Sequence, residues 1–278
     1  MSEYILTLSC ADTRGIVASV TGFLAEQDGF IIESTQFGDP STQRFFMRVH
    51  YTAQYNLSDA FFKHVAQRFS MDWQIHDCAI KPRVLLMVSQ HLHCLNDVLH
   101  RYRTGRLAID IPAVVSNHEA AHSMVEWHGV PFHYLPMDAR NKPVQEDALW
   151  DIMTREKIDV VVLARYMQIL SPELSAKLRG KAINIHHSFL PSFKGAKPYH
   201  QAYARGVKLI GATAHYVTDD LDEGPIIEQE VERVDHSKPP EELAAIGHDI
   251  ESLVLARALK YHIEHRVLLN GNKTVVFR

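Results

Sequence analysis

Uninterrupted apolar runs of strand length constrain the fold of this chain more than any other feature. Residues 84–88 are Val-Leu-Leu-Met-Val, and residues 158–163 are apolar apart from one aspartate. A strand that is apolar throughout is covered on both faces, which is typical of a parallel sheet. Residues 92–102 between the two runs show the spacing of a helix with one apolar face. This alternation predicts an α/β domain with a mostly parallel sheet.

The first eighty residues follow a different pattern. Asp12 and Thr13 can cap a helix that begins near Ile16, and we expect Gly29 to end it in the left-handed conformation. A second helix is expected after Ser58. The order βαββαβ predicts a ferredoxin-like domain. Its four strands are expected over residues 4–8, 30–37, 44–51 and 73–80.

Pro82 separates the two patterns, because proline interrupts regular structure. A chain of 278 residues is long enough for two domains. We therefore predict a first domain over residues 1–82 and a second domain over residues 83–278.

The composition excludes several classes of partner. The formal net charge is −4 and the chain has no run of lysine and arginine, so neither nucleic acid nor an anionic membrane is an expected partner. No apolar run approaches the roughly 18 residues of a membrane helix, and the first residues do not resemble a signal peptide. The three cysteines are scattered, which favours reduced thiols and a cytoplasmic protein.

Histidine is abundant, with 18 residues, several of them adjacent. Such clustering suggests a metal site, but the chain has neither an HExxH pattern nor the spacing of a zinc finger. We therefore expect no catalytic metal.

One segment combines the side chains that acyl transfer needs. Asn184 and His186 follow an expected strand over residues 181–183 and, two positions apart, should face the same side. An acidic loop ending at Gly224-Pro225 can bring Asp222 to them. An amide, an imidazole and a carboxylate can stabilise an oxyanion and accept a proton. Spacing alone leaves a second interpretation open, in which Asn184 caps a turn, His186 lies in the core and Asp222 is an ordinary loop residue.

The first domain resembles the ACT family. The resemblance rests on the segment Asp12-x-Arg14-Gly15-Ile16-Val17 between the first strand and the first helix. It implies a small effector, often an amino acid, and edge-to-edge pairing of domains into a homo-oligomer, a dimer or a tetramer. The alternative is that Gly15 only permits a tight turn.

The second domain resembles the folate-dependent formyltransferase family over residues 83–278. The motifs are Asn184-Ile185-His186, Leu190-Pro191, Phe193-x-Gly195 and Leu221-Asp222-x-Gly224, in matching order. The resemblance implies a Rossmann-like formyltransferase fold. It also implies that Asn184, His186 and Asp222 carry catalysis.

The resemblance further implies a pocket for the pterin ring of the folate. For Met167 and Ile169, ordinary core packing remains an alternative, and His215 is expected to support the catalytic residues. The residues expected to line the pocket or support it are Met167, Ile169, Leu170, Thr218, Asp219 and His215.

The formyl acceptor is the next question. Glycinamide ribonucleotide transformylase binds its phosphate with a glycine-rich loop, whereas residues 89–95 here contain no glycine. A tRNA acceptor needs a basic surface, which the negative net charge does not favour. Water needs no binding site of its own, so with these two acceptors disfavoured we expect water to receive the formyl group.

Three stretches resemble the deformylase branch of the family: His93-Cys94-Leu95-x-Asp97, residues 163–171 and residues 185–191. This implies hydrolysis of 10-formyltetrahydrofolate to tetrahydrofolate and formate, which would supply purine synthesis, with no permanently bound cofactor. Two alternatives remain open: formyl transfer to a small amine such as glycinamide ribonucleotide, and an inactive, effector-binding regulator. The transferases usually have proline where His187 stands, and the residues alone assign His187 no role.

Overall fold

The computed structural model describes residues 1–54, 56–57, 59–138, 140–190 and 198–278. The chain divides into two compact units. The first comprises Met1–Lys81 together with Glu264–Arg278, and the second comprises Pro82–Ile263. The division between Lys81 and Pro82 lies one residue before the predicted boundary, and the last fifteen residues, predicted in the second domain, belong to the first unit.

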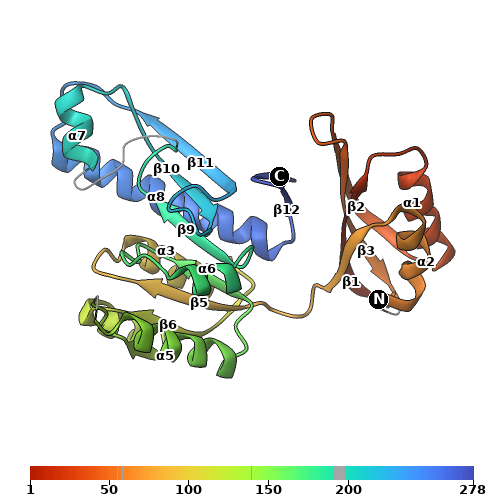
Figure 1. Cartoon of the computed structure of the whole chain (residues 1–278), viewed down its shortest axis with the longest axis horizontal. Helices are drawn as coiled ribbons and strands as arrows, with labels where there is room; N and C mark the ends of the chain where they lie inside the picture. Colours follow the sequence, from red (N-terminus) through yellow and green to blue (C-terminus); the bar gives the residue numbers. More distant parts are fainter. Residues whose placement is uncertain (55, 58, 139, 191–197) are drawn as a thin grey trace. The chain divides into compact units, whose positions relative to one another are not determined.

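The first unit has the predicted order βαββαβ and an antiparallel sheet with strand order β2-β3-β1-β4. Helices α1 and α2 cover one face of this sheet (Figure 1). Leu6, Leu8 and Leu24 are among the side chains buried between them. The elements are β1 (Ser2–Ala11), α1 (Ile16–Glu26), β2 (Phe30–Asp39), β3 (Arg44–Ala53), α2 (Asp59–Phe69) and β4 (Asp72–Asp77).

The end of α1 differs from the prediction. Asp28, not Gly29, has the left-handed backbone, with φ of 54°. Glycine is needed at position 29 for another reason: a Cβ there would lie 2.8 Å from the carbonyl oxygen of Leu24. The predicted cap Ser58 lies outside the described residues.

A C-terminal hairpin completes the first unit. It consists of β12 (Val267–Asn270) and β13 (Lys273–Val276). Arg48, which is 2% exposed, donates to the carbonyl oxygen of Glu264 (3.1 Å), and Asn270 donates to Asp39 (2.7 Å). Arg266 pairs with Glu33 (3.3 Å). These polar contacts with β2 and β3 explain why the segment joins the first unit.

The second unit is built on a seven-stranded sheet with strand order β11-β10-β9-β8-β5-β6-β7. The strands from β7 to β9 along this order are parallel, and β10 and β11 are antiparallel to their neighbours, which confirms the predicted mostly parallel sheet. The strands are β5 (Arg83–Val88), β6 (Asp110–Ser116), β7 (Phe132–Tyr134), β8 (Val160–Leu163), β9 (Ala182–His186), β10 (Leu209–Tyr216) and β11 (Ile226–Arg233).

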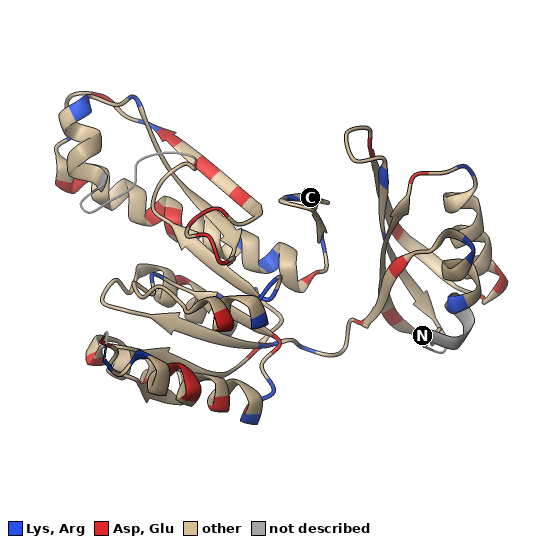
Figure 2. Cartoon of the chain, viewed as in Figure 1, with Lys and Arg blue, Asp and Glu red and all other residues tan. Residues whose placement is uncertain are grey.

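Helices connect the strands of this sheet, and the long helix α8 packs against α3 and strands β9 to β11. Among the described residues, no helix is both long and apolar enough to cross a membrane. Basic and acidic side chains are interspersed over the unit (Figure 2). The helices are α3 (His93–Arg103), η1 (Glu119–Ala121), α4 (His122–Trp127), α5 (Lys142–Arg155), α6 (Pro172–Lys177), α7 (Pro198–Arg205) and α8 (Pro240–Ile263).

Candidate active site

A cavity of about 330 Å³ lies in the second unit, beside the carboxyl ends of β8 and β9. Ligands bind in this place in open α/β sheets. All nine side chains singled out from the sequence line it: Asn184, His186, Asp222, Met167, Ile169, Leu170, Thr218, Asp219 and His215. Of the motif residues, 191–195 lie outside the described part of the chain.

Strands β9 and β10 position the amide and the first imidazole. Strand β9 extends to His186, so Asn184 and His186 belong to the strand itself and do not follow it as expected. They line the same cavity, as their spacing of two predicts. His215 lies opposite Asn184 in the register of β10.

His215 fixes the orientation of the Asn184 amide. Its Nδ1 lies 2.9 Å from the carbonyl oxygen of Tyr216 and must donate, because a carbonyl only accepts. In the neutral ring Nε2 therefore accepts, and Nδ2 of Asn184 donates to it over 3.2 Å. The second N–H of the Asn184 amide remains for a ligand in the cavity.

The loop between β10 and β11 carries Asp222. The residue has a left-handed backbone, with φ of 59°, a conformation that aspartate and asparagine tolerate better than most side chains. Tyr216 donates its N–H to the carbonyl oxygen of Pro225 (2.9 Å), which closes the loop. A Cβ on Gly224 would overlap the carbonyl of Tyr216, so the closure requires glycine there.

Asp222 contacts His186 directly, with 3.2 Å between Oδ2 and Nδ1. Burial raises the pKa of Asp222, but the interactions with His186 and His215 together outweigh burial and hold that pKa below its usual range. His215 lies 3.7 Å away, too far for a hydrogen bond, and its Nε2 is engaged by Asn184. The carboxylate is therefore ionised at neutral pH, and Nδ1 of His186 donates to it, since an ionised carboxylate only accepts.

The exposure of the apolar side chains that line the cavity decides between two interpretations left open by the sequence. Met167 is 55% exposed and Ile169 is 61% exposed, so core packing does not account for either side chain. Leu170 is 7% exposed and belongs to the core of the second unit. Thr218 donates its hydroxyl to the carbonyl oxygen of Asp220 (3.0 Å), and Asp219 is exposed at the rim.

Sequence reasoning did not identify Arg165 as part of the site, although it stood in a quoted motif. Arg165 lies two residues after the end of β8, lines the cavity and is only 8% exposed. It contacts His187, which also lines the cavity (2.9 Å). A charged residue just beyond a fully buried strand, at the end of the sheet where ligands bind, was the available signal.

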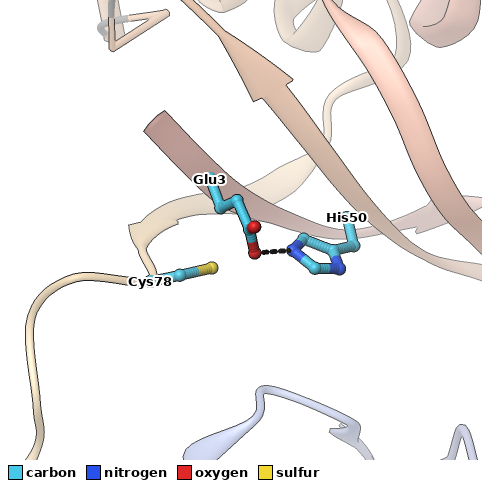
Figure 3. Close-up of side chains that lie close together, drawn as sticks. All are labelled: Glu3, His50 and Cys78. Carbon is cyan, nitrogen blue, oxygen red and sulfur yellow. Dashed lines mark hydrogen bonds and ion pairs between the residues drawn. The ribbon is translucent and has the colours of Figure 1, made fainter. Parts of the chain in front are cut away.

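Two groups of described side chains are close enough to hold a metal ion. Glu3, His50 and Cys78 form one group in the first unit, with 3.0 Å between the carboxylate and the imidazole (Figure 3). His93, Cys94 and Glu251 form the other. None of these residues lines the cavity, so an ion held by either group would not contact a substrate there.

Comparison with known proteins identifies relatives over the whole chain. The formyl transferase family profile matches residues 82–259. The formyltetrahydrofolate deformylase of Corynebacterium sp. strain P-1 is 50% identical, and the match covers 100% of both chains. The crystal structure of formyltetrahydrofolate deformylase from Burkholderia mallei superposes with a TM-score of 0.95 at 54% identity and also covers 100% of each chain.

A formyltransferase structure matches part of the chain. Glycinamide ribonucleotide transformylase 1 from Symbiobacterium toebii superposes with a TM-score of 0.66 at 27% identity. The match covers 71% of this chain and 95% of the transformylase.

Proposed function

The chain belongs to the formyl transferase family, among its formyltetrahydrofolate deformylases, and from this premise we propose that it hydrolyses 10-formyltetrahydrofolate to tetrahydrofolate and formate. The reaction takes place in the cavity that holds Asn184, His186 and Asp222. The convergence of these three groups in one cavity is the observation that carries the proposal.

In the proposed mechanism water adds to the formyl carbon without a covalent enzyme intermediate. The free N–H of Asn184 and Nε2 of His186 donate to the formyl oxygen as negative charge develops on it. Nε2 of His186 is buried and has no hydrogen-bond partner among the described residues, so it is available for this contact. As the carbon–nitrogen bond breaks, a proton from the water passes to N10 of the folate.

Asp222 orients the water and receives its proton in transit. A general base works best when its pKa is near the working pH, and the low pKa of Asp222 makes the free carboxylate a weak base. Its contribution is therefore mainly orientation, and proton transfer follows only as the attack increases the acidity of the water.

The segment between β5 and α3 supports water as the acceptor. The segment between β5 and α3, residues 89–92, contains no glycine and offers no glycine-rich cradle. Helix α3 begins with His93, whose ring bonds the buried carboxylate of Glu251 (2.8 Å). A buried carboxylate next to this helix start disfavours a phosphate there.

The decisive measurement is formate release by the purified protein from 10-formyltetrahydrofolate, with a chelator present and no amine added. Rapid release is expected, and Asn184→Ala or Asp222→Asn should lower it at least about 10²–10³-fold. Asparagine tolerates the left-handed backbone at position 222, so that variant tests the charge and not the fold. Release that requires glycinamide ribonucleotide or another amine would show that the acceptor was assigned wrongly.

We further propose that the first unit binds a small effector, such as an amino acid, and pairs with copies of itself. The βαββαβ fold supports this assignment. Gly15 has φ of 91°, so the backbone alone requires glycine at that position. Glycine there is therefore consistent both with an ACT domain and with a tight turn that has no further role.

The three free cysteines support a reducing, cytoplasmic environment.

A further inference from the structure

His187 shares the cavity with the catalytic groups although its neighbour in sequence is His186. Adjacent residues of a strand face opposite sides, but β9 ends at His186 and both rings line the cavity. Their ring centroids are 4.6 Å apart and their planes are inclined by 22°. His187 is therefore within reach of whatever reacts beside His186.

Arg165 determines which nitrogen of His187 carries the proton. Nη1 of Arg165 lies 2.9 Å from Nδ1 of His187. A guanidinium has no acceptor, so Nδ1 must accept and the ring proton is on Nε2. Burial and then the charge of Arg165 lower the pKa of His187 to about 4, so the ring stays neutral at pH 7.

Glu251 on α8 holds Arg165 in place. Its carboxylate lies 3.3 Å from Nε of Arg165 and is fully buried. It also bonds His93 (2.8 Å) and the hydroxyl of Tyr199 (2.7 Å). Burial opposes the charge of Glu251, but the bond from His93 and the charge of Arg165 lower its pKa to about 2. The arginine thus has a fixed, ionised partner.

Nε2 of His187 is buried and has no hydrogen-bond partner among the residues that the structure describes. A buried, unpaired N–H is destabilising, and such groups in native proteins call for an explanation. The charged and titratable groups around the ring are Arg165, His186, Asp222 and Glu251. None of them bonds Nε2, which leaves this N–H for a ligand.

We propose that His187 is a further catalytic residue whose Nε2–H donates a hydrogen bond to the oxygen of the attacking water, with Arg165 and Glu251 as positioning residues. The inference rests on the proposed hydrolysis. Asn184 and His186 already provide donors for the formyl oxygen, whereas Asp222 provides the water with an acceptor only. A water held by one acceptor can still rotate, and a second, donating contact fixes the lone pair that attacks.

The first test compares water with a small nucleophile that can replace it. His187→Ala should lower kcat for formate release about 10²-fold with little change in KM, since the contact belongs to the attacking water. Formyl transfer to added hydroxylamine should fall much less, because the variant leaves the donors for the formyl oxygen intact. His187→Gln, which can place an N–H near the same point, should recover part of the rate.

The control is His133→Ala, which replaces a half-buried histidine of β7 outside the cavity and should leave both reactions unchanged. Unchanged kcat in His187→Ala and His187→Gln would overturn the inference and leave the proposed hydrolysis standing. Equal losses with water and hydroxylamine would overturn the assignment to water. Absence of formate release by the unaltered protein would instead overturn the proposed function.

The second test separates a tautomer-fixing role of Arg165 from a structural one. Arg165→Gln combined with Glu251→Gln leaves no unpaired buried charge and removes the cation that opposes protonation of His187. The ¹⁵N chemical shifts of the His187 ring should then show both neutral tautomers, whereas the unaltered protein should show the proton on Nε2 alone. The His187→Gln variant assigns these resonances, and a ring that keeps its proton on Nε2 alone in the double variant would contradict the proposed role of Arg165.

Discussion

The active-site amide of Asn184 is oriented by a histidine that is itself fixed by backbone. His215 donates from Nδ1 to the carbonyl of Tyr216, which leaves its Nε2 as the acceptor for Asn184. His215 is 2% exposed, so this pair is shielded from water. The free N–H of this amide is thereby oriented before any ligand binds, which is the condition under which donors to a developing negative charge contribute most.

The exposed apolar wall gives a prediction about binding. Met167→Ala and Ile169→Ala should each raise KM for 10-formyltetrahydrofolate about tenfold, because each removes apolar contact with the ligand worth on the order of 1–2 kcal/mol. Because the contact is equal in ground state and transition state, kcat should change little. Steady-state kinetics with Val144→Ala, an exposed apolar residue of α5 outside the cavity, provide the comparison. A fall in kcat at constant KM would contradict a binding role.

At the scale of elements, the loop that carries Asp222 depends on one glycine. Gly224→Ala should displace the loop, since the added Cβ would overlap the carbonyl of Tyr216. A displacement of about 1 Å can cost on the order of 10²-fold in rate. Formate release is the measurement, and Gly22→Ala, where a Cβ meets nothing within 4 Å, is the matched control. Equal activity of the two variants would show that the loop position does not matter.

The periodic elements, and the placement of Asn184 and His186 in one cavity, could be predicted from the sequence. The apolar runs gave β5 and β8, because strands buried on both faces need continuous apolar residues. The spacing of Asn184 and His186 was enough to predict that both side chains face one side. Placing Asp222 beside these two residues depended on the resemblance to a family, because no local pattern indicates where a loop returns to the sheet.

Two features were not predictable from local patterns. The buried pair of Arg165 and Glu251 joins a strand end to a helix far along the chain, and no local pattern indicates that these two charges meet. The hairpin of β12 and β13 follows the second domain directly, so its association with the first unit depends on tertiary contacts such as Arg48 with Glu264. After the end of α1, Asp28 adopts the left-handed conformation that is ordinarily expected of glycine.

At the scale of the whole molecule, histidines held neutral make both units sensitive to acid. Burial lowers the pKa of His76 in the first unit to about 4, and burial with Arg165 lowers that of His187 in the second to about 4, from an ordinary value of 6.5. Between pH 6.5 and 4 the unfolded chain binds protons that the folded chain does not. The free energy of unfolding should therefore be greatest above pH 6.5 and fall as the pH drops towards 4.

Urea denaturation at a series of pH values measures this dependence. His76→Gln should reduce the slope of the free energy of unfolding against pH for the first unit. The glutamine side chain binds no proton in either the folded or the unfolded state. The same slope in the variant and the unaltered protein would show that His76 titrates normally. Formate release at pH 7 provides the control, since His76 belongs to the unit without the cavity.

The hairpin formed by β12 and β13 also bears on the order of events during synthesis. Domains generally fold as units while the chain is being made, beginning from the N-terminus. Here the ribosome has translated all of Pro82–Ile263 before it reaches Glu264–Arg278. Until then Glu33, Arg48 and Asp39 lack the partners that Glu264–Arg278 supplies. These contacts of the first unit can therefore form only after the whole second unit has been synthesised.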